Sequence, residues 1–345
     1  MIRVILHGLG GIGQRIARNA LDKKSLEIIG AVTARPEDLG KDLGDLLGMD
    51  RTLGVEVTPS LKELLEKQKA DVVMDATFSW VADIKTFLFE SVRAGCNFIS
   101  VCEELAYPWG NNPQLCHEID EQAKAHSVTV MGTGINPGFF GDLIPLAFTA
   151  ACKTVDRITF IRTTDAAGLG PSALDPFAIG KPLQEFETRL DGGKLKGFTG
   201  HRECIMEIAD TLGWRISDIQ RTIEPQVTEC DRRGPFFHIK PAMVCGVKQE
   251  TVGIGEGGEV LISLTLRVVF QPDEASIAED AARGYKPGNF ITVEGDPGLE
   301  VEVQGLSDAA GATAIHTVNA IPYVVQARPG FLSPRDFPPF VPRMQ

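Results

Sequence analysis

The feature that most constrains this chain is a glycine-rich turn near its start, between an apolar run and a helical run. Residues Ile2 to Leu6 form the apolar run, and Gly8-Leu9-Gly10-Gly11-Ile12-Gly13 follows it. Between a strand and a helix, the glycines of G-x-G-x-x-G turn tightly, let the backbone approach a pyrophosphate and let the helix pack closely on the sheet. The helix N-terminus offers its free N–H groups to the phosphates. The sequence therefore predicts a dinucleotide site that includes Gly8, Gly10, Gly11, Ile12 and Gly13. The alternative is an ordinary glycine-rich turn.

The end of the predicted second strand bears on which dinucleotide is bound. Proteins that bind NAD usually place Asp or Glu about 20 residues after the glycine motif, where it holds the ribose 2′-hydroxyl. Thr33 stands there instead, and Arg35 follows two residues later. A guanidinium is always charged and suits a 2′-phosphate. We therefore expect Thr33 and Arg35 to contact the cofactor, with NADP favoured and NAD possible. The alternative is that Arg35 is a solvated residue beside Glu37 and Asp38.

Composition excludes several other classes of function. The 345 residues carry 34 basic and 46 acidic side chains, a net charge of −12, without a basic block, so nucleic acid is not an expected partner. The seven cysteines form no C-x-x-C and no Cys/His cluster at metal spacing, so no metal site is expected. No apolar run reaches the roughly 18 residues of a membrane span, and the chain starts in a predicted core strand without room for a signal peptide. We expect a cytoplasmic protein without membrane partners.

The order of predicted elements divides the chain into two parts. Up to about residue 135, predicted strands alternate with helices, two of which have start signals at Ser60 to Glu63 and at Asn112-Pro113. Such alternation is typical of a parallel sheet covered on both faces. Residues 157–163, 260–270, 289–294 and 299–304 then predict strands with short turns, around helices at about 142–152 and 200–214. A last helix at 309–327 is expected to return to the first domain.

We therefore predict an α/β protein with a Rossmann-type doubly wound parallel sheet and a second α+β domain on a mostly antiparallel sheet. Residues 1–137 with about 309–345 form the predicted dinucleotide-binding domain. Residues 138–308 form the predicted domain for substrate binding and dimerisation.

In open α/β sheets, ligands bind beyond the carboxyl ends of the strands. The residues after the predicted strands are therefore cofactor candidates, and Phe78 could form a wall of the pocket. Thr77 and Ser79 offer hydroxyl groups, although both could instead cap a helix. The turn from Gly132 to Gly138 is rich in backbone N–H groups and suits a nicotinamide, or it is a hinge between domains. The candidates at these junctions are Ala76, Thr77, Ser79, Cys102 and Asn136.

Glu103 and Glu104 lie side by side after a predicted buried strand, where solvation is poor and ionisation costly. Hydride chemistry at a carbon that carries nitrogen needs a base for the proton of an ammonium or of water. Neighbouring side chains near a strand end point in opposite directions, so only one can face the site. We predict Glu103 as the catalytic base, with Glu104 as the alternative. Both could also be supporting residues that pair with backbone or an arginine.

The predicted substrate pocket takes residues from both domains. Phe139, Phe140 and Trp109 could shape an apolar pocket, although aromatic residues beside a buried turn are commonly core. Arg162 could clamp a carboxylate. His201, with Arg202, could do the same, or it could cap a helix. The Gly/Pro-rich stretch at 168–182 is expected to form a loop over the site.

Three segments together resemble the 2,4-diaminopentanoate dehydrogenase family, which includes native amine dehydrogenases. They are Cys102-Glu103-Glu104-Leu105-Ala106-Tyr107-Pro108-Trp109, Gly132-Thr133-Gly134-Ile135-Asn136-Pro137-Gly138-Phe139 and Thr317-Val318-Asn319-Ala320-Ile321-Pro322. The resemblance covers nearly the whole chain, and the first domain is similar to that of dihydrodipicolinate reductase. It implies a homodimer that deaminates a primary amine to a ketone with NAD(P), or runs the reverse reaction with ammonia. It also implies a catalytic glutamate at Glu103 and an asparagine near the nicotinamide at Asn319.

The chain departs from the family pattern around residues 200–204 and 162–176, both expected to line the pocket, so the exact amine is open.

Two rival functions remain. The first is an imine or carbonyl reductase of the same fold, although the His-His-Arg and Lys-x-x-Lys signals of a dihydrodipicolinate reductase are absent. The second is a dinucleotide sensor without enzyme activity.

Overall fold

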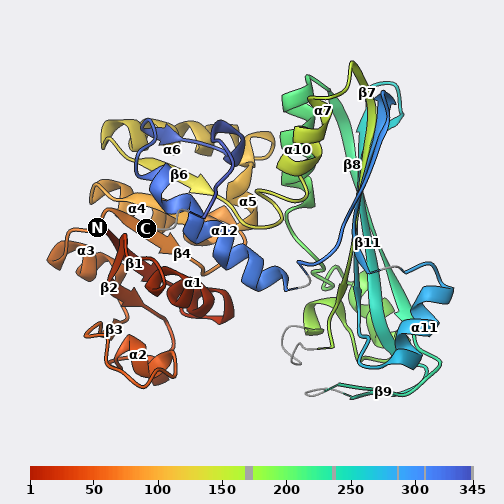
Figure 1. Cartoon of the computed structure of the whole chain (residues 1–345), viewed down its shortest axis with the longest axis horizontal. Coiled ribbons are helices and arrows are strands. Elements are labelled where there is room, and N and C mark those ends of the chain that lie inside the picture. Colours follow the sequence, from red (N-terminus) through yellow and green to blue (C-terminus); the bar gives the residue numbers. More distant parts are fainter. Residues whose placement is uncertain (168–173, 235–237, 286, 307, 343–345) are drawn as a thin grey trace. The chain divides into compact units, whose positions relative to one another are not determined.

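The protein divides into two compact units. The computed structural model describes residues 1–167, 174–234, 238–285, 287–306 and 308–342 (Figure 1). Unit 1 comprises Met1–Leu143 with Asp308–Gln345, and unit 2 comprises Ile144–Ser307. Within the described residues, no helix combines the length and the apolar character needed to cross a membrane.

Unit 1 is built on a seven-stranded sheet in the order β15-β6-β5-β4-β1-β2-β3. Every neighbouring pair is parallel, which confirms the predicted doubly wound sheet. The strands are β1 (Ile2–His7), β2 (Leu26–Val32), β3 (Val57–Thr58), β4 (Val72–Asp75), β5 (Asn97–Ser100), β6 (Thr129–Gly132) and β15 (Gly330–Phe331).

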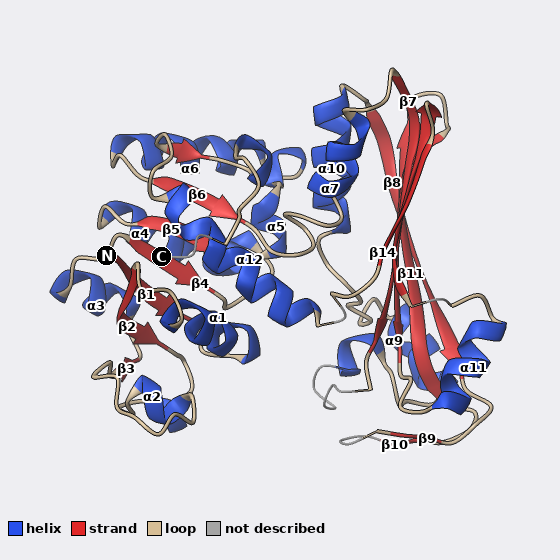
Figure 2. Ribbon diagram, in the orientation of Figure 1, coloured by secondary structure: helices blue, strands red, loops and turns tan. Residues whose placement is uncertain are grey.

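Helices cover both faces of this sheet (Figure 2). One apolar cluster packs α1 (Gly11–Leu21) and α12 (Ala309–Val324) against the strands, and a second packs α3 (Leu61–Lys67), α4 (Val81–Arg93) and α6 (Pro113–Ala125). Short helices α2 (Leu43–Leu46) and α5 (Glu103–Ala106) complete the unit, with 3₁₀ turns at Pro36–Asp38, Pro108–Gly110 and Pro334–Asp336. Helix α12, near the end of the chain, thus packs within unit 1.

Helix starts follow the sequence signals in part. The Ser60 hydroxyl accepts a hydrogen bond from the Glu63 N–H, at 3.2 Å, and so caps α3 as predicted. Asn112 precedes α6 but makes no side-chain cap. At the start of α12, Asp308 accepts from the Gly311 N–H at 3.0 Å. Gly311 therefore belongs to the capped first turn of α12.

Unit 2 is built on a six-stranded sheet in the order β14-β13-β7-β12-β11-β8. The sheet is mostly antiparallel, as predicted, but β12 and β7 pair in parallel. Its strands are β7 (Thr154–Asp165), β8 (Ile216–Val227), β11 (Val244–Gly255), β12 (Val260–Val269), β13 (Gly288–Asp296) and β14 (Leu299–Val303), with a separate small ladder of β9 (Arg232–Arg233) and β10 (His238–Ile239).

In the described part of unit 2, four helices and one 3₁₀ turn accompany this sheet. Helix α10 (His201–Leu212) was predicted from its apolar spacing, and its Ile205 packs against β11 at Gly253, the ladder partner of Ile262 on β12. The others are α7 (Leu143–Thr149), α9 (Leu183–Asp191), α11 (Glu274–Ala282) and the turn Asp175–Phe177. The predicted strands and helices did not include β8, β11, α9 or α11.

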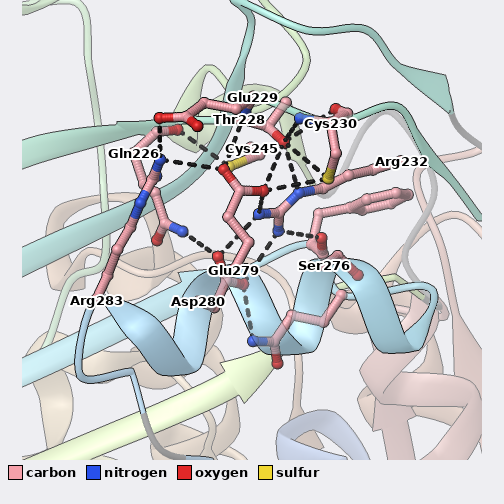
Figure 3. A network of polar contacts seen from close by, with 12 residues as sticks. Gln226, Thr228, Glu229, Cys230, Arg232, Cys245, Ser276, Glu279, Asp280 and Arg283 are labelled. Carbon is pink, nitrogen blue, oxygen red and sulfur yellow. Dashed lines mark hydrogen bonds and ion pairs between the residues drawn. The ribbon is translucent and has the colours of Figure 1, made fainter.

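A buried ionic network joins α11 to the small ladder (Figure 3). The fully buried guanidinium of Arg232 donates to Glu279 at 2.7 Å and to both carboxylate oxygens of Asp280 at 2.8 and 3.0 Å. The Gln271 amide donates to Asp280 at 2.7 Å. Removal of one partner would leave a buried charge uncompensated, so the network fixes the position of α11.

Candidate functional site

The glycine turn has the backbone geometry that a pyrophosphate requires. Gly8 has a φ of +89°, and a Cβ there would lie 2.7 Å from the Ala76 carbonyl oxygen. A Cβ at Gly13 would lie 1.8 Å from the Gly8 carbonyl oxygen, so only glycine fits at either position. A Cβ at Gly11 would meet nothing within 4 Å, and α1 has no side-chain cap and no acidic residue in its first turn. The N–H groups at the start of α1 thus face an open, unneutralised surface that fits a dinucleotide phosphate.

Arg35 lies across this turn. Its Nη2 donates to the Leu9 carbonyl oxygen at 2.5 Å, and its Nη1 is 3.5 Å from the Asp38 carboxylate. The side chain is 43% exposed, so it can still meet a phosphate from solvent. Thr33 is buried, and its hydroxyl accepts from the Arg35 backbone N–H at 3.3 Å. Arg35 thus lies beside Asp38, as in the alternative, and also places a cation beside the glycine turn.

A buried carboxylate that the sequence analysis did not identify joins the carboxyl ends of three strands. Asp75, at the end of β4, is fully buried. Its Oδ1 accepts from the Thr77 hydroxyl at 2.7 Å and lies 2.9 Å from the His7 Nδ1, while its Oδ2 accepts from the Ser100 hydroxyl at 2.6 Å. The Cys102 N–H donates in turn to Ser100 at 3.0 Å. Asp75 thereby fixes the strand ends that the predicted site residues follow.

The predicted hydroxyl groups lie beyond β4, and neither caps a helix. Thr77 donates to Asp75 and keeps its lone pairs as acceptors. Helix α4 begins at Val81 without a side-chain cap from the residue before it. Ser79 is half-buried, and Phe78 is 51% exposed beside it. Both hydroxyls therefore stay candidates for the cofactor, with Phe78 as an apolar neighbour.

Cys102 is buried, and burial raises the pKa of its thiol far above the ordinary value. The thiol is therefore protonated and inert at neutral pH. Cys102 therefore contributes its backbone to the site, directly before the two glutamates.

The two glutamates have different surroundings. Glu104 is buried, and its Oε2 accepts from the Val81 N–H at 2.7 Å. Its Oε1 accepts from the Asn112 amide at 3.4 Å, and its own N–H donates to the Ser79 carbonyl oxygen at 3.2 Å. Glu104 therefore caps α4 and ties α5 to it, which is the supporting role left open by the sequence. Glu103 is only half-buried.

The expected reason for their divergence was wrong. Strand β5 ends at Ser100, and Glu103 opens the short helix α5 rather than continuing a strand. Neighbouring side chains on a helix diverge by about 100° rather than 180°. Helical geometry, and not strand alternation, therefore sets the angle between the two side chains.

The turn from Gly132 to Gly138 packs tightly against α5 and α12. A Cβ at Gly132 would lie 2.3 Å from the Leu105 carbonyl carbon. The Ile135 N–H donates to the Thr313 hydroxyl at 3.2 Å, and the Gly138 N–H donates to Asp142 at 2.6 Å. Asn136 is half-buried within this turn. The turn is thus a rigid part of unit 1.

The aromatic residues predicted for the pocket divide between core and surface. Phe140 is buried at 3% exposure, and Trp109 stacks on Phe331 with ring centroids 4.4 Å apart. Phe140 is thus buried and Trp109 packs against the core, which fits the core alternative, and the assignment of Phe140 to the substrate pocket stays a prediction. Phe139 is half-buried, and its ring lies 4.8 Å from that of His316.

His316 is a second residue that the sequence analysis did not identify. It is 7% exposed, and its Nε2 has no hydrogen-bond partner. Burial lowers the pKa of its imidazole to about 4, and a hydrogen bond to the Gly138 backbone opposes this only in part. A neutral imidazole with a free nitrogen beside Phe139 is a candidate contact for substrate. The sequence signal that could have identified His316 is its position on α12, one residue before the segment Thr317-Val318-Asn319.

The structure does not support Asn319 as a cofactor contact. Asn319 lines a small hollow with Lys23, Ser25 and Leu26, at the amino end of β2. The glycine turn lies at the opposite, carboxyl edge of the sheet. With a rise of 1.5 Å per residue, Asn319 lies about 15 Å from Ala309 along the axis of α12, beyond the site.

In unit 2, Arg162 and His201 are both buried, and Arg202 is exposed. The His201 Nδ1 lies 3.1 Å from the Thr251 hydroxyl, and burial lowers the pKa of this imidazole to about 3. His201 is therefore a neutral residue between α10 and the sheet, and not a charged clamp or a helix cap. Of the predicted loop at 168–182, residues 168–173 lie outside the described part, and the rest includes the turn Asp175–Phe177.

Comparisons with known proteins extend over both units. A family model described as the 2,4-diaminopentanoate dehydrogenase C-terminal domain matches residues 139–344. One described as the N-terminus of dihydrodipicolinate reductase matches residues 2–96. The chain is 32% identical to the 2,4-diaminopentanoate dehydrogenase of Acetoanaerobium sticklandii, covering 99% of this chain and 94% of that protein.

Two amine dehydrogenases are also similar. The chain is 23% identical to one from Streptomyces virginiae, covering 98% of this chain and 96% of that protein. The solved structure of one from Mycobacterium smegmatis matches with a TM-score of 0.84 and 26% identity, covering 99% of this chain and 97% of that one.

Proposed function

This chain belongs to the 2,4-diaminopentanoate dehydrogenase family, and we propose that it deaminates a 2,4-diaminopentanoate-like amine to a ketone and ammonia, or runs the reverse reaction. That it is an NAD(P)-dependent oxidoreductase acting on an amine follows from the family and from its amine dehydrogenase relatives. The observation that carries the proposal is the 32% identity across 99% of the chain.

We propose that NADP is the preferred cofactor. The glycine turn and the start of α1 would hold the pyrophosphate, and Arg35 would pair with the 2′-phosphate. Thr33, Ala76, Thr77, Ser79, Cys102 and Asn136 surround the same strand ends, which Asp75 fixes. When bound, the nicotinamide accepts a hydride from the carbon that carries the amine.

Glu103 is the proposed base. It takes a proton from the substrate ammonium, so that the free amine can lose hydride and become an iminium. Glu103 then assists the addition of water to that iminium, and ammonia leaves. The sum is R₂CH–NH₃⁺ + NADP⁺ + H₂O → R₂C=O + NH₄⁺ + NADPH + H⁺. Glu104 supports the assignment, because its cap on α4 occupies the neighbouring carboxylate.

We also propose a homodimer that uses the face of the unit 2 sheet opposite α10. Along each strand, side chains alternate between the two faces, and α10 packs on the face of Gly253 and Ile262. The opposite face carries half-buried apolar side chains, among them Ile161, Val252 and Phe290. Such a face suits a second copy of the chain, and sedimentation equilibrium of the purified protein tests this.

A screen of amines and ketones with NAD and NADP, with and without ammonium, tests the proposed reaction. Oxidation of NADPH by a ketone only when ammonium is present supports it. Oxidation that does not depend on ammonium supports the rival imine or carbonyl reductase. Cofactor binding with no turnover across the panel supports the dinucleotide sensor. The expected cytoplasmic location stays a prediction.

A further inference from the structure

Two buried polar atoms of unit 1 lack hydrogen-bond partners beside the same glycine. Thr133 follows β6 and is 2% exposed, and His316 on α12 is 7% exposed. Among the described residues, the Thr133 Oγ1 and the His316 Nε2 have no hydrogen-bond partner. A Cβ at Gly138 would lie 2.7 Å from the Thr133 Oγ1, and the Gly138 backbone hydrogen-bonds the His316 imidazole. The two unused atoms therefore belong to one region at the carboxyl end of β6.

The bond to Gly138 determines which nitrogen of His316 carries the proton. Burial lowers the pKa of the imidazole to about 4, and the Gly138 backbone opposes this, as a carbonyl oxygen that accepts from the ring does. The ring is therefore neutral at pH 7, with its proton on the nitrogen that faces this carbonyl. Because Nε2 has no partner, that nitrogen is Nδ1. Nε2 is then a hydrogen-bond acceptor without a donor.

The surroundings of the two atoms supply no replacement partner. The Thr133 N–H donates to the Ser100 carbonyl oxygen at 2.9 Å, which fixes this residue to the end of β5. The His316 ring packs against the rings of Phe139 and Phe340, at centroid distances of 4.8 and 5.2 Å. A buried polar group without a partner costs free energy, and such groups indicate places where something else binds. Both atoms are thus held in place for a ligand.

The chemistry of the two atoms specifies that ligand. The His316 Nε2 needs a donor, and the Thr133 hydroxyl has a proton to donate. A primary carboxamide offers an NH₂ donor and a carbonyl acceptor side by side, whereas a substrate ammonium offers donors only. In open α/β sheets the cofactor lies beyond the carboxyl ends of the strands, where Thr133 follows β6 next to β5. The nicotinamide ring of the cofactor carries a carboxamide.

We propose that Thr133 and His316 bind the carboxamide of the nicotinamide. The Thr133 hydroxyl donates to its oxygen, and the His316 Nε2 accepts from its NH₂ group. The ligand of His316 is then the cofactor and not the substrate. Held at two points, the ring would keep one orientation, which hydride transfer requires. The proposal needs only a nicotinamide cofactor and unit 1, and it depends neither on the amine nor on the choice between NADP and NAD.

Calorimetric titration with cofactor analogues tests the pair without turnover. The ligands are NADP⁺, its 3-acetylpyridine analogue, in which a methyl group replaces the amide NH₂, and adenosine 2′,5′-bisphosphate, which lacks the pyridine ring. The wild type should bind the acetyl analogue about 3- to 10-fold more weakly than NADP⁺, because Nε2 stays unpaired. His316→Leu should remove this difference. Thr133→Val should weaken both dinucleotides about 3- to 10-fold, and neither variant should change binding of the bisphosphate more than about twofold.

Conservative and control variants exclude a merely structural effect. Thr133→Ser keeps the hydroxyl and should bind as the wild type does, and His316→Gln keeps an acceptor and should recover part of the discrimination. Thr317→Val is the matched control on α12, because its buried hydroxyl already donates to the Thr313 carbonyl oxygen at 2.6 Å. It should change none of the three affinities.

Two results would overturn the proposal. One is wild-type discrimination against the acetyl analogue that persists in His316→Leu. The other is equal weakening of all three ligands, the bisphosphate included, in the variants of both residues, which would show that they only support the fold. Since no amine is present, either result leaves the proposed reaction untouched, and loss of the proposed reaction in the amine screen leaves this subsite untouched.

Discussion

The Glu104 carboxylate accepts a hydrogen bond of 2.7 Å from the backbone N–H of Val81. Glu104, which follows β5, therefore caps α4, the helix that follows β4. The residue before Val81 is Trp80, which has no side-chain acceptor for this purpose. One of two adjacent glutamates is thereby committed to structure. The other, Glu103, is left as the candidate for chemistry.

Glu104→Ala should destabilise unit 1. The loss of an N-terminal cap costs about 0.5–2 kcal/mol, and this carboxylate is also buried. Urea unfolding of the wild type and the variant measures the free energy of unfolding. Glu104→Gln keeps an acceptor oxygen and should restore most of the difference. A variant as stable as the wild type would show that Glu104 is not the cap of α4.

Arg35→Ala should remove the preference for NADP. The lost charge-assisted hydrogen bonds predict NADP binding about 10- to 100-fold weaker, while NAD binding stays close to the wild-type value. Fluorescence titration with the two reduced cofactors gives both dissociation constants. Lys41→Ala is the matched control, because Lys41 also pairs with Asp38, at 3.1 Å, but lies further along the chain. Equal weakening of both cofactors would argue against a 2′-phosphate contact.

Glu279 should make the stability of unit 2 depend on pH. Burial alone would raise the pKa of its carboxyl, but hydrogen bonds from the Glu229 backbone and from Arg232, Cys230 and Thr228 lower it to about 2, against an ordinary 4.5. Because the folded pKa is the lower one, the stabilisation is complete above about pH 4.5 and is lost as the pH falls toward 2.

Urea unfolding at pH 5 and pH 3 tests this in the wild type and in Glu279→Gln. The wild type should lose more free energy of unfolding between these pH values than the variant does. Glu294→Gln, at an exposed carboxylate of the same unit, should behave as the wild type does. An identical loss in the wild type and Glu279→Gln would contradict the predicted pH dependence.

The sequence predicted unit 1 well because its parallel strands are short apolar runs that alternate regularly with helices. Unit 2 was harder to predict. Strand β8 runs along the sheet edge with exposed residues at half of its positions, such as Asp218 and Gln220, and β11 includes glycines at several positions. Neither gives the apolar run or clean alternation that identifies a strand.

The sequence predicted those parts of the site whose residues lie within one short segment of the chain. The glycine turn and the glutamate pair are local motifs, whereas the contact between Asp75 and His7 spans 68 positions and depends on strand pairing. The contact of His316 with Gly138 likewise arises only when α12 packs against the turn after β6. Asn319 was misplaced because a helical motif does not say which end of the helix meets the ligand.

The most direct measurement is steady-state turnover of Glu103→Gln with NADP and a diamine substrate, beside cofactor titration of the same protein. The variant keeps the size of the side chain but cannot accept a proton. We expect kcat to fall at least about 100-fold, as for loss of a general base, while cofactor affinity stays near the wild-type value. A variant that retains wild-type kcat would show that Glu103 is not the base.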